Sequence, residues 1–421
     1  MNKTLLLDVI KSEIERTTGC TDPGAMCLAV ARATEELGQM PERIEVIVSP
    51  NVYKNGVNVG VPGTGKRGLP IAAALGAVIR HSERSLAILE DVTAEHLAHA
   101  EQLVREQRVA VRFTRDAPDP LYIRADVRAG IHRASATIAG DYSTIVEVTH
   151  GSAVTFATSQ QSQTGSHNAF ADCDLRELIE LTFQAEVSEL QFLLDAANVN
   201  RQATETGMST KLGAALHRQM VNLPAPFSAV ELARLWTGAA GEARMSGMRV
   251  PIIAIAGSGN HGIVNFLGPL AVAQAVGASE EQLARALAIS STVTVYIKGF
   301  IQRMTAFCGC AVAASPGVAA SATHLLGGNW DAMTRAMHSV IGALAGMVCD
   351  GAKESCAYKI SMATATAIQS AYLAAEGVGV ESQMGVVGAD IEATIRNLGA
   401  LNNPGMVETD RFLLDLIAGS R

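Results

Sequence analysis

The sequence predicts an α+β protein, with an N-terminal α/β domain followed by a mostly helical domain rich in alanine and glycine. Strand-like and helical segments alternate in the first part of the chain, whereas helical periodicity dominates the second. A polar stretch at 159–167 separates the two parts and resembles a linker. The chain of 421 residues is also longer than a typical single domain, because domains usually hold roughly 100 to 200 residues. We therefore expect two domains, at 1–160 and 168–421.

The composition is that of a globular protein with a core of small side chains. Charged residues make up 18% and aromatic residues 4% of the chain, and glycine is frequent. The formal net charge of −8 and the absence of a Lys/Arg-rich run argue against a nucleic-acid partner. Seven cysteines, an odd number at irregular spacing, do not suggest a disulfide framework. These features predict a cytoplasmic enzyme whose cysteines bind a metal or act in catalysis.

The N-terminus reads as a first helix over 4–17, in which Leu6, Ile10 and Ile14 are four residues apart on one face. Asp8 and a following lysine interrupt the apolar run, so a signal peptide is not expected.

A tight turn at Cys20 follows this helix. A second helix is predicted from Thr21 to about Leu37, because Thr21 or Asp22 can cap it and Pro23 fits its first turn. The free N–H groups at a helix N-terminus favour a thiolate or bind an anion. Cys20 is therefore a candidate catalytic residue.

The rest of the first domain alternates strands and helices. Strands are predicted at 43–49, 109–114, 121–127, 135–138 and 144–149, and helices at 69–80 and 94–107.

A glycine-rich segment, 50–68, connects the first strand to the next helix. It resembles a phosphate-binding loop, but Arg67 stands where that motif needs Ser or Thr, so nucleotide binding is not expected. We expect a mobile lid or a substrate-facing loop, with Asn51, Lys54 and Lys66 as polar candidates.

Two long stretches of the second domain, 250–279 and 304–330, contain no Asp, Glu, Lys or Arg. Each is long enough to span a bilayer, which takes about 20 residues. Both are interrupted by Pro, Asn, His, Gly and Ser, whereas a spanning helix needs sustained large apolar residues. We interpret them as buried helices and expect no membrane association.

The segment 256–262, Ala-Gly-Ser-Gly-Asn-His-Gly, is predicted to be a turn whose N–H groups and Ser258 hydroxyl could hold a carboxylate. A simple helix-to-helix turn is the alternative. The segment also resembles the carboxylate loop of pyridoxal-phosphate dehydratases. No lysine occurs between Lys211 and Lys298 to form their Schiff base, which weakens that interpretation.

The remaining cysteines suggest either a metal site or ordinary burial. Cys349 and Cys356 are seven residues apart, equivalent to two helical turns, and Cys308 and Cys310 lie upstream. Three thiolates with one open position would suit a cluster or metal acting as a Lewis acid. Buried free cysteines are an equal alternative on spacing alone. A zinc hydrolase is disfavoured because no His-Glu-x-x-His occurs. Two further cysteines are assigned to the core, Cys27 and Cys173.

Taken together and in order, the motifs resemble the L-cysteine desulfidase family, which is related to the alpha domain of the iron–sulfur L-serine dehydratases. The resemblance extends from about residue 10 to residue 418. The motifs that carry it are Gly19-Cys-Thr-Asp-Pro23, Ser49-Pro-Asn-Val-Tyr-Lys-Asn-Gly56, Val61-Pro-Gly-Thr-Gly65, Gly257-Ser-Gly-Asn-His-Gly262, Cys308-Gly-Cys310, Gly346-Met-Val-Cys-Asp-Gly-Ala-Lys353 with Cys356, and Gly405-Met-Val-Glu-Thr-Asp410.

The resemblance implies a 4Fe-4S cluster held by three cysteines, with the fourth iron open to the leaving group of the substrate. Cys349 and Cys356 match two ligands, and the third is Cys308 or Cys310, of which we favour Cys308. Cys20 matches a cysteine proposed as a base or acid. The residues expected to bind the substrate are Asn51, Lys54, Ser258 and Asn260.

The function expected from these features is α,β-elimination on a small amino acid, most simply L-cysteine to pyruvate, ammonia and sulfide. The alternatives are dehydration of L-serine or another β-substituted amino acid, or a non-enzymatic redox or amino-acid sensor that carries a cluster. The choice of substrate depends on a few pocket contacts. The long Ala/Gly-rich helices make a homodimer plausible.

Overall fold

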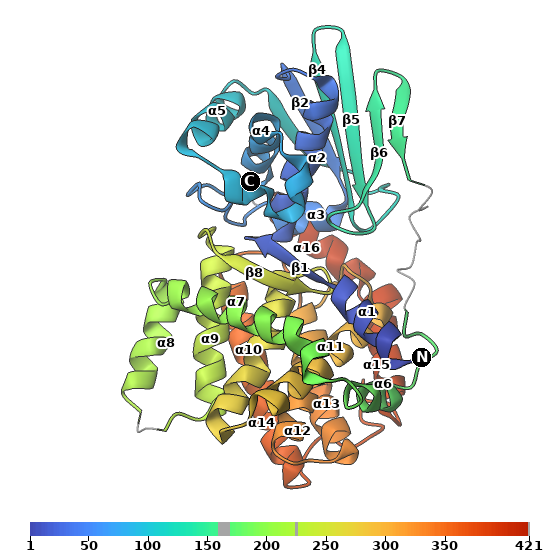
Figure 1. Cartoon of the computed structure of the whole chain (residues 1–421). Coiled ribbons are helices and arrows are strands. Elements are labelled where there is room, and N and C mark those ends of the chain that lie inside the picture. Colours follow the sequence, from blue (N-terminus) through green and yellow to red (C-terminus); the bar gives the residue numbers. More distant parts are fainter. Residues whose placement is uncertain (159–168, 224–225, 420–421) are drawn as a thin grey trace.

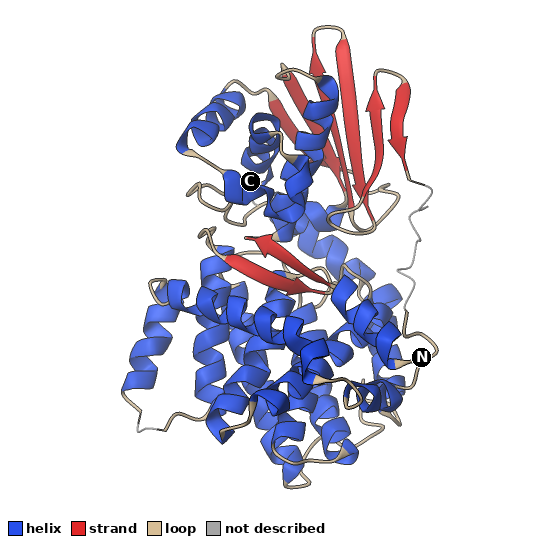
Figure 2. Ribbon diagram, viewed as in Figure 1, coloured by secondary structure: helices blue, strands red, loops and turns tan. Residues whose placement is uncertain are grey.

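The computed structural model describes residues 1–158, 169–223 and 226–419, and it confirms the α+β class. A sheet with helices on one side forms the first part, and a bundle of helices forms the second (Figures 1 and 2). The predicted linker at 159–167 lies outside the described residues, so the division into two domains there stays a prediction. No helix in the described ranges has the length and apolar character needed to cross a membrane.

The N-terminal part is built on a six-stranded sheet in the order β3-β2-β4-β5-β6-β7. β2 pairs in parallel with β3, and every other pairing is antiparallel. The five predicted strands are confirmed, and one fully exposed edge strand, β7, was not predicted. The strands are β2 (Arg43–Val48), β3 (Val109–Phe113), β4 (Tyr122–Ala129), β5 (His132–Ala139), β6 (Ile145–His150) and β7 (Ala153–Ala157).

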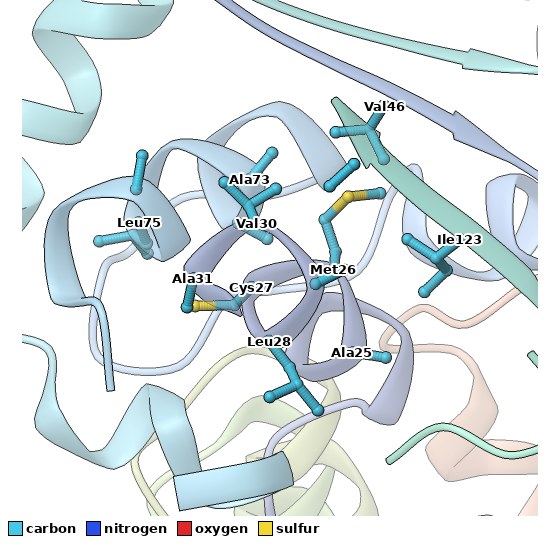
Figure 3. Close-up of a cluster of buried hydrophobic side chains, with 14 of the residues drawn as sticks. Ala25, Met26, Cys27, Leu28, Val30, Ala31, Val46, Ala73, Leu75 and Ile123 are labelled. Atoms are coloured by element: carbon cyan, nitrogen blue, oxygen red, sulfur yellow. The ribbon is translucent and has the colours of Figure 1, made fainter. Parts of the chain in front are cut away.

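Helices cover one face of this sheet. Burial alternates along β2, whose Ile44, Val46 and Val48 face the core, as expected for a sheet with one solvated face. α2 packs against both the sheet and α4, and small side chains allow this close packing (Figure 3). Cys27 lies in this core, as predicted. The helices here are α2 (Thr21–Leu37), α4 (Leu69–Ile79), α5 (Ala94–Arg105) and the 3-10 segment η1 (Ser82–Asp91).

The glycine-rich segment 50–68 differs from the predicted loop. Its first part is a short helix, α3 (Pro50–Gly56). The remainder packs against the end of the helical part, where Gly60 contacts the backbone of Ser246. Lys66 pairs with Glu101 rather than facing a site.

The helix predicted over 4–17 is wrong in its second half. α1 (Lys3–Ser12) is followed by strand β1 (Ile14–Thr18), which pairs antiparallel with β8 (Pro251–Ile255). A partner strand that is distant in the sequence thus overrides the local helical spacing. Leu6 and Ile10 are fully buried in a core otherwise made of helical-part residues. The first residues of the chain therefore pack with the second part (Figure 1).

The second part is helical, as predicted, apart from β8. Its uncharged stretches form buried helices, and α10 is buried over most of its length. Close helix contacts depend on small residues, since a Cβ at Gly268 would lie 2.6 Å from Val318. Cys173 is half-buried against this core. The helices are α6 (Leu175–Thr182), α7 (Gln191–Gly207), α8 (Lys211–Val221), α9 (Ala229–Met245), α10 (Gly259–Val276), α11 (Glu280–Ile301), α12 (Ser315–Leu325), α13 (Trp330–Leu344), α14 (Cys356–Ala375), α15 (Ile391–Ala400) and α16 (Val407–Gly419), with the short segments η2 (Val187–Leu190), η3 (Cys310–Ala314) and η4 (Leu401–Gly405).

The two parts meet around β1, β8, α3 and α16 (Figure 1). The C-terminal helix α16 returns to the N-terminal part through two ion pairs, Lys54 with Asp410 and Arg115 with Asp415. Both ends of the chain therefore cross the junction.

Candidate functional site

A cavity of about 110 Å³ lies at this junction, and it gathers the site residues predicted from the sequence except Lys66. The walls come from the starts of α2 and α3, the β8–α10 turn, and the two cysteine segments. The predicted residues lining it are Cys20, Asn51, Lys54, Ser258, Asn260, Cys308, Cys349 and Cys356, together with Cys310.

The two cysteine segments are held side by side by backbone hydrogen bonds. The N–H of Cys308 donates to the carbonyl of Met347 at 2.6 Å, and the N–H of Cys349 donates to the carbonyl of Ala306 at 2.7 Å. These bonds close an antiparallel bridge between segments about forty residues apart in the chain. The backbone, rather than a disulfide, therefore brings these thiols to one wall; all of the cysteines are free.

The loop between Cys349 and Cys356 is braced by one acid and two lysines. Asp350 pairs with Lys353 at 2.7 Å and with Lys359 at 2.5 Å. Partial burial of Asp350 opposes ionisation, but the hydrogen bonds from both lysines hold its pKa at about 2. These three residues are absent from the cavity lining. They brace the cysteine loop from outside the cavity lining.

The thiols along this wall differ in acidity. The Cys310 thiol donates to Cys308, which lowers the pKa of Cys308 and raises that of Cys310. Burial raises the pKa of Cys349, and it raises that of Cys356 to about 11. Since ligands bind as thiolates, Cys308 is better prepared than Cys310. The cavity lining includes both, so the choice between them stays a prediction.

The donor set at this wall consists of thiols. In the part of the chain that the structure describes, no three His, Cys, Asp or Glu side chains are grouped so as to hold one metal ion. The four thiols nonetheless influence one another electrostatically across the same wall. A cubane cluster takes one cysteine at each of several irons, so its ligands are spread apart. Thiolates are also the ligands that iron–sulfur clusters use.

Cys20 faces the cysteine wall from the start of α2, where it is the N-cap residue. Its thiol donates to Asp22 Oδ2 at 3.3 Å. Burial and the charge of Asp22 raise the pKa of Cys20, so the thiol is protonated at neutral pH. The predicted thiolate is therefore wrong for the free protein, because desolvation outweighs the favourable helix N-terminus.

Asp22 is itself buried and accepts two side-chain hydrogen bonds. Its Oδ1 accepts the hydroxyl of Tyr142 at 3.0 Å. Burial raises the pKa of Asp22 to about 6, and the hydrogen bonds from Cys20 and Tyr142 oppose that rise. A carboxylate that ionises near neutral pH, bonded to a thiol in a cavity, is suited to proton transfer.

α3 supplies three polar side chains to the cavity. Lys54 is almost fully buried and forms an ion pair with Asp410. The amide oxygens of Asn51 and Asn55, one helical turn apart, are buried and make no hydrogen bond among the described residues. Lys54 is thus charge-compensated, whereas the two amides are not satisfied.

The turn predicted to hold a carboxylate joins a strand to a helix rather than two helices. Ala256 and Gly257 have positive φ angles of 49° and 76° and lead to Ser258, the N-cap of α10. The Ser258 side chain makes no capping bond, so its hydroxyl is available to the cavity. Asn260 accepts from Arg244 Nη1 at 2.9 Å.

The structure adds lining residues that the sequence interpretation did not select, among them Tyr142, Arg244, His261, Lys298 and Arg303. Burial lowers the pKa of Lys298 to about 7, and burial together with Lys298 lowers that of His261. A charged residue within an Ala- or Thr/Val-rich helix is the signal that could have identified Arg244 and Lys298.

Comparisons with known proteins match almost the whole chain. A family profile described as serine dehydratase alpha chain matches residues 83–415. A UPF0597 protein of Methanocella arvoryzae is 53% identical over all of this chain and 99% of its own length. UPF0597 proteins of Bacteroides thetaiotaomicron and Aeromonas hydrophila are each 37% identical, over 98% of this chain and at least 97% of theirs.

The profile covers the cysteine wall and the α10 turn but begins after Cys20 and α3, which only the relatives cover. Its match extends over more than half of the sequence. The chain therefore belongs to the serine dehydratase alpha chain family.

Proposed function

We propose that this protein is an iron–sulfur lyase that catalyses α,β-elimination on a small β-substituted amino acid, with L-cysteine as the first candidate substrate. The observation that supports this proposal is that four thiols and the Cys20–Asp22 pair line one small cavity. Family membership supports the reaction class.

Cys308, Cys349 and Cys356 are the residues that would hold a 4Fe-4S cluster. When bound, a cluster with one open iron supplies a Lewis acid for the leaving group on Cβ. The lysine-braced loop around Asp350 and the bridge to Ala306 fix the ligands in place.

The chain's own residues would handle the proton on Cα. Ionised Asp22 takes the thiol proton of Cys20, and the Cys20 sulfur then removes the Cα proton. The Cβ–S bond breaks as the Cα=Cβ bond forms, and sulfide leaves. The enamine tautomerises, and water hydrolyses the resulting imine to pyruvate and ammonia.

L-Serine is the second candidate substrate, because the matching family profile is described as serine dehydratase alpha chain. The same steps would then release water in place of sulfide. A cluster-bearing sensor is the non-enzymatic alternative, and it predicts ligand binding without any pyruvate.

The test is anaerobic reconstitution of the full-length protein with iron and sulfide, followed by pyruvate and sulfide assays on L-cysteine and L-serine. We expect visible absorption, iron in excess of zinc, and pyruvate from at least one substrate. C349S should lose both absorption and turnover, whereas C20S should keep absorption and lose turnover. C173S, remote from the cavity, is the control and should keep both. A reconstituted protein with absorption but no pyruvate from either substrate would contradict the proposal.

A cytoplasmic location and a homodimer stay predictions from composition. An open iron also predicts that activity decays in air, which repeated assays after exposure to oxygen would measure.

A further inference from the structure

Arg244 carries a buried positive charge without a carboxylate partner. It comes from the last turn of α9, is 2% exposed and lines the cavity. Nη1 donates to the neutral amide of Asn260, while Nε makes no hydrogen bond among the described residues. The charge of Arg244 acts on the carboxyl of Asp22 through space, but in those residues no carboxylate lies within salt-bridge distance of Arg244. An unpaired buried guanidinium is costly, so the site is suited to an anion that is not part of the chain.

The N-terminus of α10 lies directly against this guanidinium. A Cβ at Gly259 would overlap Arg244 Nε, so only glycine allows this approach. α10 is an 18-residue helix, and its N-terminus carries the positive end of its dipole. Two positive groups in contact repel each other unless an anion joins them. Lys54, one of the residues expected to bind the substrate, differs from Arg244 because Asp410 already neutralises its charge.

α3 presents hydrogen-bond acceptors to the cavity, in contrast to the positive groups of Arg244 and the α10 N-terminus. Asn51 and Asn55 contribute two buried amide oxygens that lack donors, and both residues line the same cavity. An ammonium group has three N–H donors and no acceptor. The cavity therefore contains unmet acceptors from one part of the chain and an unmet donor from the other.

We infer that the cavity recognises the zwitterion of a free α-amino acid, with its carboxylate on Arg244 and the α10 N-terminus and its ammonium on the amide oxygens of Asn51 and Asn55. The guanidinium suits this role because it binds carboxylates in a fixed planar geometry, and Asn260 holds its orientation. The inference rests on the proposed function and specifies which end of the substrate is bound where. Amino-acid amides and simple carboxylic acids should be excluded.

The test uses calorimetric titration of the full-length protein with L-alanine, which has no leaving group and cannot be eliminated. L-Alaninamide lacks the carboxylate and propionate lacks the ammonium. Wild type should bind L-alanine roughly 10- to 100-fold more tightly than either analogue. R244M should lose that advantage over L-alaninamide, and R244K should recover part of it. N55A should weaken binding of L-alanine but not of propionate. R234M, an exposed arginine on the same helix, is the matched control and should bind as wild type.

Equal binding of L-alanine and either analogue by wild type would overturn the inference, and that comparison requires no variant. Unchanged L-alanine affinity in folded R244M would also overturn it. These outcomes are separate from those for the proposed function. Binding of L-alanine without pyruvate from L-cysteine or L-serine refutes only the lyase, whereas pyruvate release with unchanged R244M affinity refutes only the role of Arg244.

Discussion

Asp22 accepts a hydrogen bond from the Cys20 thiol, and its titration should be visible in both rate and stability. The proposed mechanism needs ionised Asp22 to accept the thiol proton, and the pKa of Asp22 is raised to about 6. We expect kcat/KM to rise with pH to a plateau, with a midpoint near 6. D22N should remove this limb and lower kcat by about 10² to 10⁴. The pH dependence of kcat/KM, measured for wild type and D22N, tests this prediction. A D22N profile with the same midpoint as wild type would contradict it.

The raised pKa of Asp22 also makes the stability of the folded protein depend on pH. The folded pKa of Asp22 lies above its ordinary value of 3.8, so the native state binds more protons than the unfolded state between about 4 and 6. This contribution to stability is fully present below pH 4 and is lost as pH rises through 6. Urea unfolding at pH 4.5 and 7 should therefore show a smaller loss of stability with pH in D22N than in wild type.

The sequence identified site residues by their chemistry and missed those defined by burial. Cys20, the four cysteines of the two cysteine segments, Ser258 and Asn260 belong to recognisable motifs, and all of them line the cavity. Arg244 and Lys298 belong to no motif, and their importance comes from being enclosed at a junction between distant segments. The expected Cys20 thiolate is wrong for the same reason. Burial raises the pKa of this thiol, and the sequence of the turn alone does not show how deeply Cys20 is buried.

At the scale of the element, α16 contacts the N-terminal part through two ion pairs of different burial. Lys54 is 2% exposed and Asp410 22%, whereas Arg115 and Asp415 are both more than half exposed. D410N should lower the free energy of unfolding by about 3 kcal/mol, because it leaves a buried ammonium without its counter-charge. D415N is the matched control on the same helix and should cost less than about 1 kcal/mol. Urea unfolding measures both, and equal effects would contradict this account.

Element prediction succeeded where the pattern was local. α2, α4, α5 and five strands have clear periodicity or capping residues, and the structure confirms them. β1 and β8 were missed because each is stabilised by the other across most of the chain. α3 was read as a loop from its glycine and asparagine content, although Pro50 fits the first turn of a helix.

At the scale of the whole molecule, α1 supports the helical part although it begins the chain. Leu6 is fully buried in that core, while its neighbour Leu5 is 50% exposed. L6A should destabilise the protein by about 2 to 5 kcal/mol, and L5A by less than about 0.5 kcal/mol. Thermal or urea unfolding compares the two variants. Similar small effects would show that α1 is not needed by this core.

The pairing of β1 with β8 also has a consequence for synthesis. Ile14 pairs with Ile255, so the first strand leaves the ribosome long before its partner exists. Until then its unpaired edge is open to a β8 strand of another copy, which is the route to exchanged dimers. Asp410 is made later still. The last residues that line the cavity are Cys356 and Ile360, so the cavity is not complete until that segment has been synthesised.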